Sequence, residues 1–324
     1  MKNKSITASN EISTIYTVSL GGIEQKILVE GKGKELPIVI TLHGGPGTPI
    51  PFSVGCRGLF PAFTEQFIMV YWDQLGCGIN NYEIADKFTV ESYVEMTVDL
   101  VKFMRQSFPQ NPIYLFGMSW GSVLALKTAC KQSKDIAGVV VWGQVTKKLF
   151  FNEEVYSALE ASGLSEKKMK RIRNINPKNF KPRDMQFFTG CIRKYTNGYQ
   201  NKNGKKADGG NIMLGIMKSP DYSFKNVLAM FVNGCAKSTK LWPQLLQMDL
   251  EQELQKVQVP YMILQGDTDL VTSTAIIEEI IGSCHNSNLQ YRKIDNSGHF
   301  PSAEGMGAVL DTLVEMTRND KLRQ

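Results

Sequence analysis

The stretch that most constrains this chain starts at Ile113 and reads IYLFGMSWGSVLAL. Its first residues are typical of a buried strand, its middle is Gly-x-Ser-x-Gly, and its last residues favour a helix. Glycines at 117 and 121 allow a turn too tight for side chains, which places Ser119 in a strained conformation at the head of the helix. There the helix dipole favours a developing negative charge. The stretch therefore predicts a strand–turn–helix that presents a reactive serine, a nucleophile elbow.

Length and composition are ordinary for a globular protein. The chain has 324 residues, 42% hydrophobic and 21% charged, enough to bury a sheet with helices on both faces. No apolar run is long enough to span a bilayer, and no apolar segment follows the basic residues 1–10, so we expect no signal peptide. The six cysteines include no close pair, which indicates neither a disulfide scaffold nor a zinc site. We therefore expect a cytoplasmic protein with no metal and no organic cofactor.

Strand and helix patterns alternate along most of the chain. An N-terminal hairpin turns at Gly21-Gly22, and continuous apolar runs at 38–42 and 136–142 are typical of strands buried on both faces. Apolar residues at helical spacing predict a helix over 90–108, with Thr89 as its N-cap. The predicted strands are 13–20, 25–29, 38–42, 67–72, the strand that starts at 113, 136–142, 259–265 and 289–294. This alternation predicts an α/β domain with a mostly parallel sheet.

A long basic segment interrupts this alternation. Residues 144–245 hold 19 Lys or Arg against 7 Asp or Glu, so their net charge is +12 and the rest of the chain carries −6. We interpret them as a mainly helical cap inserted after the sixth strand, between core parts 1–143 and 246–324, with a mobile tip near 200–210. A basic face is compatible with nucleic acid or anionic lipid, but no nucleic-acid-binding signature accompanies it. We expect a solvated lysine-rich surface, with neither nucleic acid nor a membrane as partner.

Glycine-rich loops follow two of the buried strands. The first, residues 43–47, reads HGGPG, and its glycines let backbone amides face a ligand without interference from side chains. Its place upstream of the elbow is that of an oxyanion loop. The second loop starts at Asp73 and contains Cys77. We expect Asp73, which precedes the nucleophile, to hold loop amides, and Cys77 to be a small buried residue.

The elbow serine has partners of the required types in the required order. Acyl transfer needs a nucleophile, a base and an acid, which follow strands in the order Ser, Asp or Glu, His. The turn after strand 259–265 offers Asp267 and Asp269, and His299 follows the last strand. Of the other histidines, His43 belongs to the glycine loop and His285 lies in a polar stretch. The predicted triad is therefore the serine, one of the two aspartates and His299.

Three motifs of the chain resemble the proline iminopeptidase (prolyl aminopeptidase) family of α/β-hydrolases. They are HGGPG at 43–47, DQLGCG at 73–78 and GMSWGS at 117–122. The likeness covers the core on both sides of the insertion. It implies the α/β-hydrolase fold, a mostly parallel sheet flanked by helices and carrying a helical cap.

The same resemblance assigns roles to residues of the site. It implies that the acid is Asp269, the second acidic position of a Gly-x-x-Asp turn, and that the base is His299. It also implies that the oxyanion donors are the backbone amides of Trp120 and of Gly45 or Gly44.

The chain departs from that family in two respects. Ser273 stands where the segment after the acid often has proline. Members of the family hold the free amino end of the substrate with carboxylates of the cap. This cap is short of acids and offers Glu153, Glu154 and Glu160 as substrate-binding candidates by position only. A strongly basic cap repels an ammonium group and suits a neutral or anionic acyl substrate.

These observations predict a serine hydrolase that acts on a small molecule or a short peptide. Three hypotheses stay open: an aminopeptidase of the proline iminopeptidase type, a carboxylesterase or other acyl hydrolase with the same machinery, and a catalytically silent binding protein. The complete set of triad residue types argues against the third.

Overall fold

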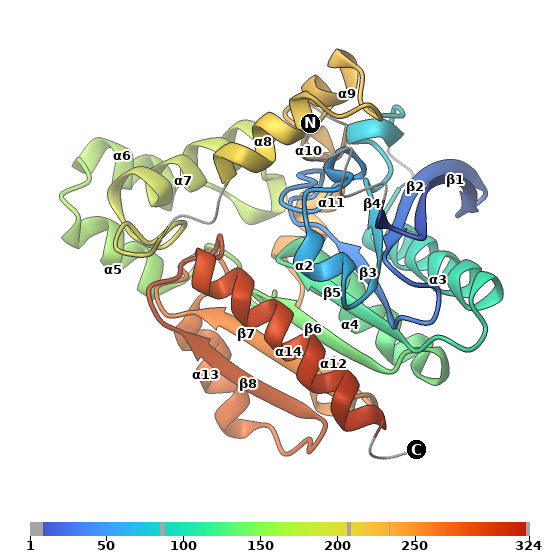
Figure 1. Cartoon of the computed structure of the whole chain (residues 1–324). Coiled ribbons are helices and arrows are strands. Elements are labelled where there is room, and N and C mark those ends of the chain that lie inside the picture. Colours follow the sequence, from blue (N-terminus) through green and yellow to red (C-terminus); the bar gives the residue numbers. More distant parts are fainter. Residues whose placement is uncertain (1–8, 85–87, 206–208, 233, 322–324) are drawn as a thin grey trace.

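One mostly parallel sheet organises the computed structural model, which describes residues 9–84, 88–205, 209–232 and 234–321 (Figure 1). The strand order is β1-β2-β4-β3-β5-β6-β7-β8. β1 and β2 form the predicted hairpin and β2 pairs antiparallel with β4, whereas the remaining pairs are parallel. The strands are β1 (Ile12–Leu20), β2 (Ile23–Gly31), β3 (Ile38–Leu42), β4 (Ile68–Trp72), β5 (Ile113–Met118), β6 (Gly138–Trp142), β7 (Tyr261–Gly266) and β8 (Leu289–Ile294). The α/β architecture predicted from the sequence is confirmed.

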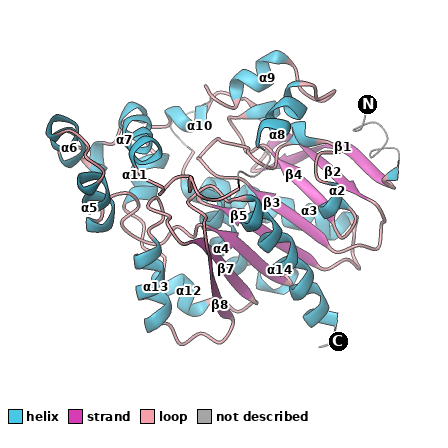
Figure 2. Ribbon diagram, turned by 60° about the vertical axis from the view of Figure 1, so that its left-hand side comes forward, coloured by secondary structure: helices cyan, strands magenta, loops and turns pink. Residues whose placement is uncertain are grey.

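Helices cover both faces of this sheet (Figure 2). α3 and α4 pack on one face through residues such as Val94 and Leu124, and α14 packs on the other through Val309 and Leu313. Because both faces are covered, β3 to β7 are buried at every position, which explains their continuous apolar runs. The helices of the core are α2 (Pro61–Thr64), α3 (Val90–Ser107), α4 (Trp120–Lys131), α12 (Glu251–Lys256), α13 (Thr274–Ser283) and α14 (Ala303–Lys321), with 3-10 turns η1 (Val54–Cys56), η2 (Gly78–Asn80) and η3 (Ser133–Asp135).

The chain between β6 and β7 is helical, and we call residues 144–245 the cap, with the bounds proposed from the sequence. In Figure 1, α5 to α7 form a lobe beside the sheet, and α8 and α9 lie above the loops that follow β3 and β4. Apolar residues of the lobe, which include Leu159, Ile172 and Phe188, are buried in the same cluster as Val94 and Leu124 of the core. The helices of the cap are α5 (Glu153–Ala161), α6 (Glu166–Arg173), α7 (Pro182–Tyr195), α8 (Gly209–Met217), α9 (Phe224–Ala229), α10 (Gly234–Lys237) and α11 (Leu241–Leu246), with the turn η4 (Pro177–Asn179).

The part of the cap expected as a mobile tip is bonded to the core over much of its length. The amide of Phe300 donates to the carbonyl of Tyr199 at 2.8 Å, and the amide of Ala303 donates to the carbonyl of Lys205 at 3.0 Å. Asn201 is buried. Residues 197–205 therefore pack against the loop that follows β8, contrary to the expectation. The expected tip also includes residues 206–208, which lie outside the described residues.

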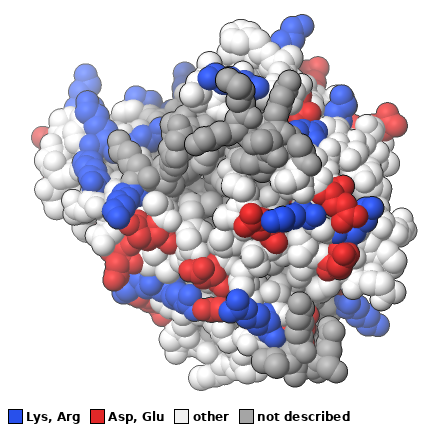
Figure 3. Space-filling model, in the orientation of Figure 1, with Lys and Arg blue, Asp and Glu red and all other residues white. Residues whose placement is uncertain are grey.

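Positive charge gathers on the lobe of the cap. Figure 3 shows Lys and Arg side chains over α6 and α7, whereas both signs alternate over the core. The exposed cations there include Lys167, Lys170, Arg171, Arg173, Arg193 and Lys194. Among the described helices, none is both long and apolar enough to cross a membrane.

Candidate active site

The nucleophile elbow has the conformation that its glycines predict. β5 ends at Met118 and α4 starts at Trp120, so Ser119 alone makes the turn, with φ 52° and ψ −118°. A Cβ at Gly121 would lie 1.8 Å from the carbonyl oxygen of Leu42, and one at Gly117 would lie 2.6 Å from the carbonyl oxygen of Gly121. Close backbone contacts therefore require glycine at both positions. The two glycines allow the tight turn in which Ser119 adopts a strained, left-handed φ.

Three distant residues meet in one row of hydrogen bonds at this elbow. Nε2 of His299 lies 2.9 Å from Oγ of Ser119, and Nδ1 of His299 lies 2.9 Å from Oδ2 of Asp269. With the proton of the neutral ring on Nδ1, His299 donates to the aspartate and accepts from the serine. The serine is 8% exposed, the histidine 6% and the aspartate 0%, so the row is almost completely shielded from water. This is the geometry of a nucleophile, a base and an orienting acid.

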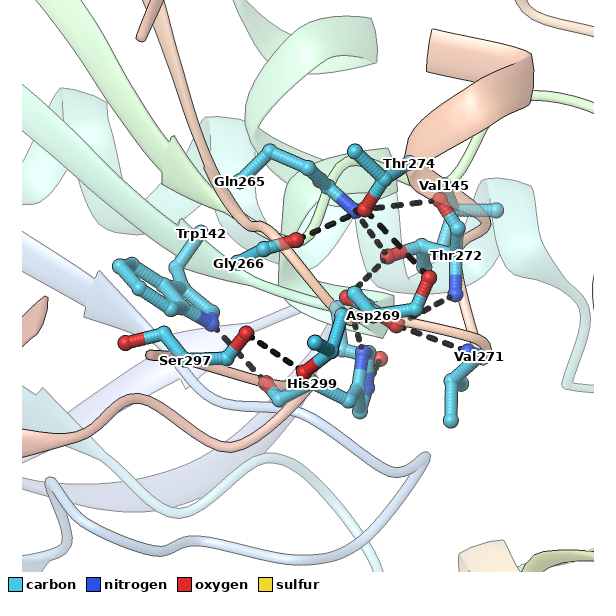
Figure 4. A network of polar contacts seen from close by, with 12 residues as sticks. Trp142, Val145, Gln265, Gly266, Asp269, Val271, Thr272, Thr274, Ser297 and His299 are labelled. Atoms are coloured by element: carbon cyan, nitrogen blue, oxygen red, sulfur yellow. Dashed lines mark hydrogen bonds and ion pairs between the residues drawn. The ribbon is translucent and has the colours of Figure 1, made fainter. Parts of the chain in front are cut away.

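The turn after β7 selects Asp269 over Asp267. Oδ1 of Asp269 accepts from the amides of Val271 (2.7 Å) and Thr272 (3.0 Å), and its Oδ2 accepts from the Thr272 hydroxyl at 2.7 Å (Figure 4). Asp267 instead accepts from the amide of Ser297 at 3.0 Å and so braces the loop that carries the histidine. Residue order alone left both aspartates open, and the resemblance implied Asp269; the backbone around each one explains why Asp269 faces the imidazole.

Three supporting residues were not singled out from the sequence. Thr272 donates to the same oxygen of Asp269 that faces His299. Trp142 donates from Nε1 to the backbone carbonyl of His299 at 2.9 Å (Figure 4). Gly143 has φ 65°, and a Cβ there would lie 3.3 Å from both Oδ2 of the aspartate and Cε1 of the histidine. A Thr three residues after the acid and a Gly directly after a buried strand were visible signals for two of them.

His43 holds the glycine loop and is not the base. Its Nε2 accepts from the amide of Gln74 at 3.0 Å, so the ring proton is on Nδ1, which donates to the carbonyl of Gly44 at 2.8 Å. Burial lowers the pKa of His43 to about 4, and the ring is neutral at physiological pH. Gln74 also accepts from Nε1 of Trp120 at 2.7 Å. The imidazole and the glutamine therefore link the glycine loop to the first residue of α4.

The glycine loop lies beside the serine. A Cβ at Gly44 would lie 3.5 Å from Cβ of Ser119. Gly45 has φ 118°, and a Cβ there would lie 2.4 Å from the amide nitrogen of Gly47. Trp120 is the first residue of α4, where backbone amides have no acceptor within the helix. The amides expected to bind an oxyanion, that of Trp120 and that of Gly45 or Gly44, thus come from two segments beside the nucleophile.

Asp73 holds loop amides, as predicted. Its carboxylate accepts from the amides of Val54 and Ile79, both at 2.9 Å, and from the hydroxyl of Tyr222 in the cap. Burial raises the pKa of Asp73 to about 6, although these three donors oppose the rise. Cys77 is buried, also as predicted, and burial raises the pKa of its thiol well above the usual value.

The three glutamates proposed for substrate binding have separate surroundings. Glu153 is exposed, and Glu160 accepts from Arg173 at 2.7 Å on the surface. Glu154 accepts from the hydroxyl of Ser273, which is also the N-cap of α13. Of the three, only Glu154 forms a hydrogen bond with the segment that follows the acid, and this bond joins the cap to the core.

A basic and aromatic part of the cap lies next to the imidazole. The Tyr199 ring centroid is 6.0 Å from that of His299, and the Arg193 guanidinium lies 4.2 Å from the Tyr199 ring centroid. Arg193 is exposed. The edge of the site on this side therefore carries positive charge. Within the described residues, no set of three or more His, Cys, Asp or Glu side chains is grouped as metal ligands would be.

Comparison with known proteins gives a family and several relatives. The family described as alpha/beta hydrolase fold matches residues 37–305. The probable aminopeptidase YbaC of Bacillus subtilis (strain 168) is 23% identical over 97% of this chain and 99% of that protein. A proline iminopeptidase of Thermoplasma volcanium is 26% identical over 80% of this chain and 78% of that protein. The crystal structure of carboxylesterase CesB from Bacillus subtilis matches 98% of this chain and 95% of that one, with a TM-score of 0.60 and 17% identity. At this identity the match shows a similar fold only.

Proposed function

Because the chain belongs to the α/β-hydrolase fold family, we propose that it is a serine hydrolase that cleaves an amide or ester bond through an acyl-enzyme. The observation that carries this proposal is the row of two 2.9 Å hydrogen bonds from Asp269 through His299 to Ser119. The serine is strained, almost buried and held at a helix N-terminus, which a purely structural serine does not need.

In the first half-reaction the enzyme is acylated. Nε2 of His299 takes the hydroxyl proton while Oγ of Ser119 attacks the carbonyl carbon of the substrate. The amides of Trp120 and of Gly44 or Gly45 stabilise the oxyanion, and the carboxylate of Asp269 stabilises the imidazolium. The scissile bond breaks as the imidazolium gives its proton to the leaving amine or alcohol.

In the second half-reaction water releases the acyl group. His299 takes a proton from the water as its oxygen attacks the acyl carbon, and the same amides hold the second oxyanion. Collapse of this intermediate returns the proton to Oγ of Ser119 and frees the carboxylic acid. Ser119, His299 and Asp269 are almost completely shielded from water. Because little water surrounds them, the charge interactions among them are stronger than they would be in solution.

For specificity, the first candidate is an aminopeptidase of the proline iminopeptidase type. The names of the relatives and the motifs at residues 43–47, 73–78 and 117–122 support it. In this reading the leaving group is the amino end of the second residue of a short peptide. The first residue, with its free ammonium group, becomes the acyl group on Ser119.

A second candidate is a carboxylesterase or other acyl hydrolase, and the charge of the cap favours it. Tyr199 lies next to the imidazole and carries Arg193 over its ring, whereas Glu153 is exposed and Glu154 accepts a hydrogen bond from Ser273. These surroundings offer less to an ammonium group than to a neutral or anionic acyl chain.

One plate separates the two candidates. Purified protein and its Ser119→Ala variant are assayed with prolyl-2-naphthylamide and with short p-nitrophenyl esters. Faster serine-dependent turnover of the amide, measured as kcat/KM, supports the aminopeptidase. Turnover of the esters alone supports the acyl hydrolase. Activity with neither substrate, together with failure of a fluorophosphonate to label the serine, would leave the silent binding protein.

A further inference from the structure

One carbonyl of the cap bridges the two loops that carry the acid and the base. The backbone oxygen of Gly198 accepts from the amide of His299 at 3.1 Å and from the amide of Leu270, the residue after Asp269, at 3.2 Å. A single acceptor thus holds one amide of the base itself and one amide adjacent to the acid. The cap therefore contributes a fixed point between two residues that come from different strands of the core.

We propose that residues 197–205, the bridging segment, position His299 relative to Asp269, with Gly198 as the central positioning residue. The proposal rests on the serine hydrolase function proposed above, because it assigns the segment a role in activating the same nucleophile. None of its residues is required to touch substrate. It acts through the two loops and sets the geometry of the 2.9 Å bond between the imidazole and the carboxylate.

Further hydrogen bonds hold the bridging segment on both loops. The hydroxyl of Thr268 lies 3.1 Å from the carbonyl of Asn197 and 3.0 Å from that of Ser297, so it joins the segment to the turn of the acid and to the loop of the base. The amide of Phe300 donates to the carbonyl of Tyr199, and the amide of Ala303 donates to the carbonyl of Lys205. The bridging segment therefore runs alongside the loop that carries His299.

Glycines let the bridging segment approach this closely. A Cβ at Gly198 would lie 2.5 Å from Cβ and Cγ of Leu270, and one at Gly298 would lie 2.8 Å from the carbonyl of Asn197. A Cβ at Gly204 would lie 2.2 Å from the carbonyl of Asn296. A methyl group at any of these positions forces the segment and a catalytic loop apart, so the contact is sensitive to the smallest substitution.

The first test compares two alanine substitutions in the cap. Gly198→Ala inserts its methyl against Leu270, whereas a Cβ at Gly190, on α7, meets nothing within 4 Å. Both variants are compared with wild type in a fluorophosphonate-labelling experiment, because this probe reports activation of Ser119 without a known substrate. Labelling is expected to slow by about tenfold or more in Gly198→Ala, since small misplacements of catalytic groups carry penalties of this size. Gly190→Ala is expected to react as wild type does.

The pH dependence of labelling separates positioning from general damage. If His299 has moved away from Asp269, the hydrogen bond that orients the imidazole is lost, and the pH–rate profile of labelling changes. A variant that is only less stable keeps the wild-type profile at temperatures where it is folded. Circular dichroism at the assay temperature establishes the folded fraction.

A second pair of variants inserts no new atom. Thr268→Val removes the hydroxyl that joins Asn197 to Ser297 but keeps the shape of the side chain, and Thr268→Ser keeps the hydroxyl. We expect slower labelling and a changed pH–rate profile in the valine variant only. This pair carries the test if Gly198→Ala does not fold.

The outcomes distinguish this proposal from the proposed function. Wild-type protein that is never labelled at Ser119 would overturn the function itself. Wild-type labelling together with equally fast labelling and an unchanged pH profile in folded Gly198→Ala or Thr268→Val would overturn the positioning role and leave the function standing. For whichever substrate of the plate is turned over, kcat should fall more than KM rises.

Discussion

The hydroxyl of Tyr222, in the cap, donates a hydrogen bond to the buried carboxylate of Asp73, in the core. The bond joins α8 and α9 to the loop that follows β4, and the ion pair between Arg57 and Asp221, with Nε and Oδ2 2.6 Å apart, lies on the same side of the cap. Burial raises the pKa of Asp73 to about 6 while the tyrosine lowers it. The stability of this cap–core contact is therefore linked to pH.

Removing the Tyr222 hydroxyl should destabilise the protein more at high pH than at low pH. Asp73 has a pKa of 3.8 in the unfolded chain and about 6 in the folded protein, so its burial costs stability as pH rises through that window. Because Tyr222 favours the charged form, Tyr222→Phe should cost about 2 kcal/mol at pH 8, the range of a hydrogen bond to a charged group, and less at pH 5. Urea unfolding at both pH values measures this, with Tyr82→Phe on the surface as control. Equal losses at both pH values would contradict the assignment.

His43 should make the protein less stable as pH falls. Its pKa is 6.5 in the unfolded chain and about 4 in the folded protein, so the unfolded state binds the extra proton between those values. The free energy of unfolding should therefore drop by about 3 kcal/mol from pH 7 to pH 4 on account of this residue. His43→Gln should remove that part of the pH dependence, and His285→Gln, at an exposed histidine, should retain it. The same slope in all three proteins would show that His43 is not held neutral.

The two aspartates after β7 should differ sharply in their effect on catalysis. Asp269→Asn removes the carboxylate that orients the imidazole and should lower kcat by about 10⁴-fold, the loss seen when a triad loses its acid. Asp267→Asn alters only the acceptor for the amide of Ser297 and should cost far less. Steady-state kinetics on the better substrate of the plate measures both. Comparable losses in the two variants would mean that the turn does not assign the acid as described.

Gly45 should tolerate no side chain. Gly45 has φ 118°, and a Cβ at this position would lie 2.4 Å from the amide nitrogen of Gly47. Gly45→Ala must therefore move the loop beside Ser119. Loss of one oxyanion donor costs about 10²–10³ in kcat, and we expect a loss of that size. Gly307→Ala, on α14 where a Cβ meets nothing within 4 Å, is the control. A folded Gly45→Ala variant with unchanged kcat would exclude this loop from the oxyanion site.

The core could be predicted from the sequence because its strands, helix cap and elbow depend on residues that are close together in the chain. Apolar runs, the hairpin pattern and the alternation of strands with helices located the eight strands of the described sheet, and the N-cap expected at Thr89 is present, with its hydroxyl accepting from the amide of Ser92 at 3.3 Å. The glycines of the elbow encode a steric requirement that reads directly from Gly-x-Ser-x-Gly. The fold class and the resemblance to proline iminopeptidases are confirmed.

What the sequence could not predict depends on contacts between distant segments. Asp267 and Asp269 follow the same strand, so residue order left both open; the resemblance implied Asp269, and the backbone of the turn shows why that residue faces His299. The polar, glycine-rich composition of 197–205 favours a loop, but it does not show that the loop's carbonyls hold amides of the catalytic loops. The cap glutamates could be chosen only by position, since their partners come from other elements.

The most direct test of the account is covalent labelling of Ser119. Wild-type protein treated with a fluorophosphonate should gain one adduct, located by peptide mass spectrometry on the segment that contains Ser119. Ser119→Ala should gain none and lose at least about 10⁴-fold in kcat, as residues of a triad do. A folded wild-type protein that stays unlabelled, or a Ser119→Ala variant whose kcat is within about tenfold of the parent, would contradict the assignment of this serine as the nucleophile.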